Sequence, residues 1–231
     1  VYFGMSVSPT YIQAATVMAA AALEQGDIEV LVNMSQMTVS QMELTKLTSS
    51  EQQRQHWLSE QILNWSHLPV VHVRPTVFLS HPFFSTWVAE SVAKDGAFRF
   101  PLGMAKTSPI AGEDVAKVIA AILQNPTKHI GKVYDLTGPR SLTGDELAQE
   151  FSVGLHHAVK FEDVDMDKWI EEMQGRGMPE HLYNHLVTMS QLHHDHRYDR
   201  EADGVAAVTG QGPMSVAEFA SLHAHDIYQV R

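Results

Sequence analysis

The sequence contains no cysteine and little positive charge, and it has no apolar run long enough to cross a membrane. Without cysteine, its 231 residues can form no disulfide, thiolate metal site or thiol nucleophile. Sixteen Lys and Arg against 27 Asp and Glu give a net charge of -11, which argues against nucleic acid and anionic membranes as partners. The longest apolar stretch, residues 14–23, has about half of the roughly 20 residues that a bilayer requires. We therefore expect a soluble, cytoplasmic protein.

The amount of apolar sequence is nevertheless ample for a folded core. Hydrophobic residues make up 44% of the chain, enough for one large core or two smaller ones. The chain starts at Val1, and the first residues, VYFG, have the character of the end of a strand. We expect that further residues precede them.

Strand and helix patterns alternate along the first part of the chain. A helix is predicted over Tyr11–Gln25 and ends at Gly26, and a buried strand follows at Ile28–Met34. A second helix through about Trp65 and a strand from Pro69 repeat the order, which indicates a doubly wound parallel α/β sheet of the Rossmann type. Shorter strands are expected at 97–101, 132–138 and 159–164, and helices at 82–94, 113–123, from Thr143, 166–174, 179–194 and 214–228.

Two further expectations concern packing. We expect the helix ending at Trp65 to present one apolar stripe to the sheet, formed by Trp57, Leu58, Gln61, Ile62 and Trp65.

We also divide the chain into the C-terminal part of a dinucleotide-binding domain, residues 1–110, and a small, mainly helical lobe, residues 111–231, with some exchange of chain between them. Ligands of such folds bind at the carboxyl ends of the strands.

Three strand ends are thus expected to meet at one crevice: 4–6, 33–36 and 74–78. Ser35 is suited to hydrogen-bond a substrate carbonyl or a cofactor amide, although serine is also an ordinary turn residue. Arg74 is suited to a phosphate or carboxylate ligand, but a structural salt bridge is the favoured interpretation.

Four segments together resemble the NmrA-like family of atypical short-chain dehydrogenases/reductases. They are NMSQMTVS (33–40), HWLSEQILNWSHLPVVHVRPTVF (56–78), KTSPIAGEDVAKVIAAIL (106–123) and GKVYDLTGPRSLTGDELA (131–148). The resemblance implies a Rossmann domain that binds NAD or NADP, with NADPH favoured, and a small lobe over the substrate. It also implies that the glycine-rich phosphate loop lies outside this sequence, because VYFG corresponds to the fourth strand of the family's sheet. The residues that it assigns to the cofactor are Gly4, Met5, Asn33, Met34, Ser35, Pro75, Thr76 and Phe78.

The catalytic groups depart from the pattern of typical short-chain dehydrogenases. No Tyr-x-x-x-Lys occurs, so the tyrosine that donates the proton in those enzymes has no counterpart. Relatives often have a lysine four residues before the glutamate at position 60, where this chain has His56. Ser35 and His56 are therefore the candidate catalytic residues, with an exposed helix histidine as the alternative for His56. Solvent is the expected proton source.

The remaining candidates concern the substrate pocket and metals. Met37, Phe83 and Trp87 are expected to wall a pocket for a planar substrate, although ordinary core packing explains them equally well. The histidines of LHHDHRYDR, residues 192–200, are interpreted as solvated surface at a helix end, and no metal site is predicted.

The resemblance implies an NAD(P)H-dependent reductase of a quinone or carbonyl compound. A dinucleotide-binding regulator without turnover is the alternative, and a fragment that binds no cofactor is the second alternative. A small-molecule substrate is the expected partner, and homodimer formation is left open.

Overall fold

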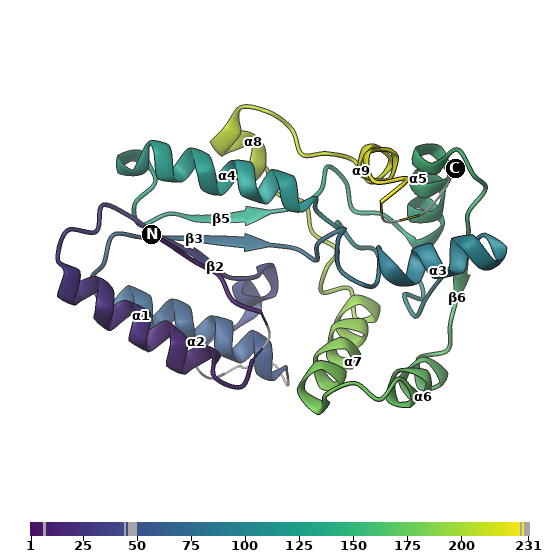
Figure 1. The fold of residues 1–231 in the computed structure, drawn as a ribbon, viewed down its shortest axis with the longest axis horizontal. Coiled ribbons are helices and arrows are strands. Elements are labelled where there is room, and N and C mark those ends of the chain that lie inside the picture. The colour runs from purple at the N-terminus through teal and green to yellow at the C-terminus, as the bar shows by residue number, and fades with distance from the viewer. Residues whose placement is uncertain (7, 44, 46–49, 227, 229–231) are drawn as a thin grey trace.

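Four parallel strands form the central sheet of the molecule. The structure is a computed structural model, and it describes residues 1–6, 8–43, 45, 50–226 and 228. The strands lie in the order β1-β2-β3-β5, and the register pairs Val32 with Tyr2 and Val71, so that all carboxyl ends share one edge (Figure 1). This confirms the predicted parallel α/β fold. The strands are β1 Tyr2–Phe3, β2 Leu31–Met34, β3 Val70–Pro75 and β5 Val133–Leu136.

Helices cover both faces of this sheet. One face is covered by α1 (Tyr11–Gln25) and α2 (Glu51–Trp65), and the other by α4 (Gly112–Gln124) and α8 (Gly204–Thr209), as Figure 1 shows. The predicted bounds of α1 are confirmed, and Gly26 ends the helix in the left-handed region at φ 81°, where glycine is favoured. The α1 alanines pack against Leu31, Leu63 and Val70, as part of one of the cores of the molecule.

The prediction for the buried face of α2 is wrong for Trp65 and Leu58, whereas Ile62 is half-buried and packs against the core between α1 and the sheet. Trp65 is 69% exposed and Leu58 is 39% exposed. The buried side chains belong instead to a mostly polar set: Gln53, His56, Ser59, Glu60 and Leu63. The periodicity of apolar residues did not identify this face because Glu60 is paired with Arg74 and His56 faces a cavity, as described below.

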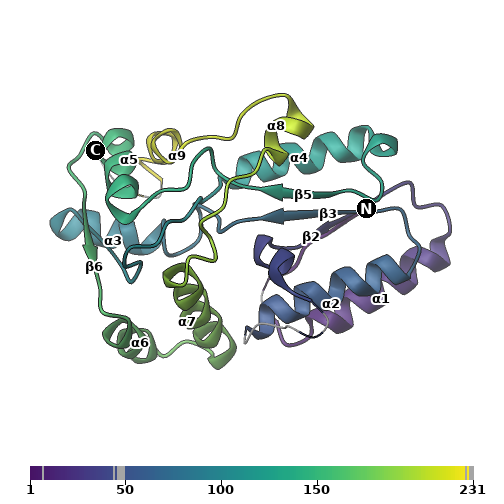
Figure 2. The same cartoon turned by 180° about the vertical axis from the view of Figure 1, so that it is seen from behind.

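A second layer holds the larger aromatic core. Its two strands, β4 and β6, pair in parallel, and α3, α5 and α9 pack around them. The helices α6 and α7 lie below them in Figure 2, with α7 on the side toward the four-stranded sheet. The predicted start of α5 at Thr143 is confirmed and is a capping box, because the Glu146 N–H donates to Thr143 Oγ1 at 3.2 Å and the Thr143 N–H to Glu146 Oε2 at 2.8 Å. The bounds are α3 Thr86–Asp95, β4 Ala97–Phe100, α5 Gly144–Leu155, β6 Lys160–Asp163, α6 Met166–Gly175, α7 Glu180–His194 and α9 Val216–Leu222.

Several short elements differ from the prediction. The helix expected over 82–94 begins only at Thr86, and the one expected over 214–228 is reduced to α9. Among the elements that were not predicted are α8 and the 3-10 helix η1, Met37–Gln41. A further 3-10 turn, η2, lies at Pro126–Lys128.

The chain passes more than once between the two layers. After the second-layer strand β4, it returns to the sheet through α4 and β5, and α8 later packs against α4 again. Residues beyond 110 thus complete the sheet layer, and the division into 1–110 and 111–231 stays a prediction. Of the helices in the described residues, none combines the length and the apolar character that a membrane span requires.

Candidate functional site

The carboxyl ends of β2 and β3 open into a cavity of about 150 Å³ between the sheet and α7. Its apolar walls include Met5, Met34, Phe78 and Met189, while polar side chains come from α2, from α7 and from the strand ends. Seven residues predicted as cofactor or catalytic groups line it: Met5, Met34, Ser35, His56, Pro75, Thr76 and Phe78.

Other predicted site residues do not line this cavity. Gly4 follows β1 on the exposed surface, and Asn33 is buried with its side-chain amide 3.0 Å from His72 Nδ1. Met37 is buried within η1. Phe83 and Trp87 lie 5.3 Å apart by ring centroids in the aromatic core of the second layer.

A buried ion pair lies under the polar side of the cavity. Arg74 donates to both carboxylate oxygens of Glu60, at 2.9 Å from Nε and 2.6 Å from Nη2, and Glu60 is 1% exposed. Burial alone would raise the pKa of Glu60, but the hydrogen bonds and charge of Arg74 outweigh it and lower that pKa, with a further contribution from Ser35. Arg74 therefore forms the predicted structural salt bridge, which fixes the end of β3 to α2.

His56 lies one turn before Glu60 on the same face of α2. It is buried against the Tyr11 ring, with the ring centroids 4.5 Å apart, so the alternative of an exposed helix histidine is wrong. Burial lowers the pKa of His56 to about 4, against the opposing charge of Glu60, and the imidazole is neutral near pH 7. Its Nδ1 has no hydrogen-bond partner within the described residues, although it is buried.

Thr76 lines the cavity but its polar groups are already engaged. The hydroxyl donates to the Ser108 carbonyl at 2.6 Å, and the backbone N–H donates to the Leu136 carbonyl at 2.9 Å. These bonds fix the loop that follows β3, so Thr76 offers a cofactor mainly the methyl group and the backbone around it.

Several cavity residues were not singled out in the sequence. His81 follows the predicted strand end by a few residues, whereas His185 and Tyr198 come from the other layer and meet the strand ends only through the fold. Gln36 Nε2, Gln52 Oε1 and His185 Nδ1 are further buried polar atoms without a partner in the described part of the chain. The nearness of His81 to the RPTVF segment was a usable signal; the others had none.

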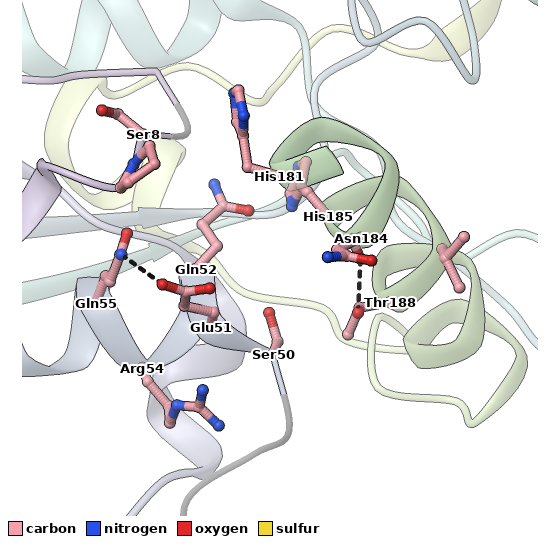
Figure 3. A pocket seen from close by; sticks show the side chains of 12 residues that line it. Ser8, Ser50, Glu51, Gln52, Arg54, Gln55, His181, Asn184, His185 and Thr188 are labelled. Atoms are coloured by element: carbon pink, nitrogen blue, oxygen red, sulfur yellow. Dashed lines mark hydrogen bonds between the residues drawn. The ribbon is translucent and has the colours of Figure 1, made fainter. Parts of the chain in front are cut away.

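A second, outer cavity of about 300 Å³ adjoins the first (Figure 3). It lies between the first turns of α2 and the side of α7, and Gln52 and His185 line both cavities. Figure 3 shows Gln52, His181 and His185 on its walls, with Gln55 donating to Glu51 at 3.3 Å. The inner cavity and the polar outer cavity therefore share part of their walls.

The interpretation of the histidines of 192–200 as solvated surface is wrong for His193. His193 and Tyr198 are buried, and their rings stack at 4.1 Å between centroids. His193 Nδ1 donates to the Met189 carbonyl at 2.7 Å. His194 and His196 are exposed, and no group of three or more candidate metal ligands occurs in the residues that the structure describes.

Comparisons with known proteins identify relatives with the same organisation. No protein-family profile matches the chain. It is 31% identical over 170 residues to an NAD(P)H azoreductase of Xenophilus azovorans, a match that covers 73% of this chain and 58% of the relative. The chain spans about half the length of the curated relatives it matches.

Solved structures are similar over nearly the whole chain. A nucleoside-diphosphate-sugar epimerase of Staphylococcus aureus superposes with a TM-score of 0.80 at 19% identity, covering 96% of this chain and 75% of the other. NmrA, a negative transcriptional regulator in complex with NAD, superposes with a TM-score of 0.70 at 17% identity, covering 92% and 69%. The chain has an NmrA-like Rossmann fold.

This NmrA-like fold confirms the resemblance found in the sequence. A triphenylmethane reductase of Citrobacter sp., complexed with NADP(H), shares it with a TM-score of 0.77 at 17% identity, covering 96% of this chain and 74% of the other. The inner cavity of this chain is smaller than the roughly 300 to 1,000 Å³ of a typical ligand pocket. Its volume and its amide and imidazole atoms without a partner in the described residues fit one ring with a polar substituent, such as a nicotinamide or a small aromatic substrate, but not a whole dinucleotide. A second ring would extend into the outer cavity, which Gln52 and His185 also line.

Proposed function

We propose that this chain carries the nicotinamide and substrate side of an NAD(P)H-dependent reductase whose substrate is a quinone or carbonyl compound. One observation carries the proposal: a small cavity at the carboxyl ends of the strands, where buried polar atoms of Gln36, Gln52 and His56 have no partner among the residues that the structure describes. The azoreductase relative and the reductase neighbour support the class of reaction. We favour NADPH over NADH as the reductant.

The cofactor, when bound, supplies a hydride. The segments Met34–Ser35 and Pro75–Phe78 would hold its nicotinamide end, with Gly4, Met5 and Asn33 nearby at the strand ends. His56 would orient the nicotinamide or its ribose, and Ser35 would position the substrate. Glu60 and Arg74 keep these groups in place by joining α2 to β3.

The proton comes from solvent in this proposal. Burial raises the pKa of Tyr11 and Tyr198, so neither phenol is activated toward proton loss in the way a neighbouring lysine would achieve. His56 is already neutral near pH 7. The residues therefore act by binding and orientation, which can supply a large part of a rate enhancement.

The test is a pair of measurements on the chain and, in parallel, on the full product of its gene. NADPH and NADH are titrated by fluorescence, and loss of the absorbance of the reduced nicotinamide is followed with quinones and aldehydes. We expect binding and substrate-dependent oxidation, with NADPH preferred. A full gene product that binds dinucleotide but oxidises none of it contradicts the reductase proposal.

That result would instead support a dinucleotide-sensing regulator. The similarity to NmrA, a negative transcriptional regulator, and the absence of Tyr-x-x-x-Lys from the sequence favour this second function. We further propose a cytoplasmic location, which cell fractionation tests, and a homodimer, which sedimentation of the purified protein tests.

A further inference from the structure

His81 presents one nitrogen of its imidazole ring to the loop, and its other nitrogen has no partner in the part of the chain that the structure describes. Its Nδ1 accepts a hydrogen bond from the Phe83 backbone N–H at 3.3 Å, so this nitrogen carries no proton. In a neutral imidazole the proton is then on Nε2. No hydrogen bond to Nε2 occurs within the described residues, and the ring lines the inner cavity. His81 thus offers a donor there.

The surroundings keep this ring neutral and fixed. It packs against Phe83 with the ring centroids 4.4 Å apart. Burial lowers the pKa of His81 to about 3, and the charges of His185 and His193, both on α7, act in the same direction. His185 lines the cavity from the other layer, with its ring centroid 6.3 Å from that of His81. A neutral, rigid N–H donor is suited to polarise an acceptor atom, because it does not need to reorganise during the reaction.

We propose that His81 is a catalytic residue whose Nε2–H donates a hydrogen bond to the oxygen of the substrate that gains negative charge during reduction. The inference rests on the proposed reductase function. The substrate carbon, or the conjugated position of a quinone, receives a hydride with its two electrons from the reduced nicotinamide, which is oxidised. The π electron pair moves onto the oxygen, where the Nε2–H stabilises it, and a solvent proton then completes the hydroxyl. His81 keeps its own proton throughout.

This assignment also narrows the substrate class. The apolar walls formed by Met5, Phe78 and Met189 suit the ring of a conjugated compound, while the donor of His81 requires an acceptor oxygen at its edge. A substrate with a polar substituent opposite this acceptor oxygen would place that substituent past Gln52 and His185, in the outer cavity.

A pair of substitutions separates the catalytic role from a structural one. In His81→Asn the side-chain oxygen can still accept the Phe83 N–H, but the distal donor is lost. In His81→Gln the amide can return a donor near the position of Nε2. We expect His81→Asn to lower kcat by about 10²-fold with a smaller change in KM, as for the loss of one donor to a developing oxyanion. The kcat of His81→Gln should stay within about tenfold of that of the parent, and the Kd for the dinucleotide should be unchanged in both variants.

A second readout does not depend on turnover. The redox-inert oxyanion 4-nitrophenolate, titrated by absorbance, should bind the parent at least about tenfold more tightly than His81→Asn. The control is His157→Asn, which changes an exposed histidine outside both cavities and should leave both readouts unchanged.

Three outcomes separate the role of His81 from the reductase function. Equal kcat and equal 4-nitrophenolate affinity in His81→Asn and the parent overturn the role of His81 while the reductase function stands. Equal losses in the Asn and Gln variants, together with a lower Tm, show a structural role and also overturn it. If the full gene product binds dinucleotide but oxidises none of it, while its 4-nitrophenolate binding depends on His81, the reductase function falls and the donor is supported.

Discussion

The helices α2 and α4 cover opposite faces of the same sheet, but they bury different kinds of side chain. From α4, Val115, Val118 and Ile122 pack against the valines of β2 and β3. From α2, the buried set includes His56 and Glu60. The apolar face of α4 gains its stability by removing hydrocarbon from water, whereas the face of α2 must satisfy each polar group that it buries.

The difference follows from what each face meets. The strand side chains opposite α4 are apolar, whereas α2 lies next to Arg74 and the inner cavity. Polar side chains on α2 are therefore stable only as partners of other polar groups or of a ligand. The helix α2, whose buried face is mostly polar, is therefore the one that contributes side chains to the site.

The largest expected effect comes from breaking the ion pair of α2. Arg74→Met leaves Glu60 buried without its partner, and a loss of about 3 to 5 kcal/mol in the free energy of unfolding is expected. Urea unfolding near pH 7 measures it. The control Arg140→Met breaks a more exposed pair with Glu150 and should cost no more than about 1 kcal/mol. Similar losses in both variants would show that burial does not distinguish the two pairs.

The apolar face of α4 is tested by shortening one side chain. Ile122→Ala removes a fully buried side chain, and the lost burial and the remaining cavity should cost about 3 kcal/mol. Leu58→Ala on α2 changes a side chain from the expected apolar stripe that is 39% exposed, and its cost should stay within about 0.5 kcal/mol. A large loss of unfolding free energy in Leu58→Ala would instead support the predicted apolar stripe of α2, which the structure contradicts.

Local signals predicted most elements because each depends on a few neighbouring residues. The α1 helix ends at Gly26 because that position requires a left-handed φ, and the start of α5 at Thr143 follows from its capping box. The strands β2 and β3 were found because the parallel sheet buries both of their faces. In α4 the apolar spacing itself matched the buried face.

The site was predicted less completely because it depends on contacts between distant residues. Ser35 and Phe78 were found from the rule that ligands lie at strand ends, whereas His185 reaches the cavity from α7. The burial of His193 was missed because its charged and polar neighbours along the chain suggested a solvated helix end. The buried face of α2 was missed for a related reason, since no sequence periodicity shows that a glutamate has a buried arginine partner.

The smallest effect concerns the response of the two helices to pH. Burial holds the pKa of His56 at about 4, below its ordinary value of about 6.5. Between these values the unfolded chain binds a proton that the folded protein does not, so stability rises with pH in this window. The contribution of His56 is fully present above about pH 6.5 and is lost progressively as the pH falls toward about 4. Near pH 5 the loss amounts to about 2 kcal/mol.

Between about pH 7 and pH 5, the free energy of unfolding of His56→Gln should therefore fall by about 2 kcal/mol less than that of the parent, as measured by urea unfolding. Part of the pH dependence should remain, since burial also lowers the pKa of His81, His185 and His193. Ile122→Ala removes no titrating group, so its cost should be the same at both pH values. A parallel shift of both variants with pH would mean that the protonation of His56 is not what distinguishes the face of α2 from that of α4.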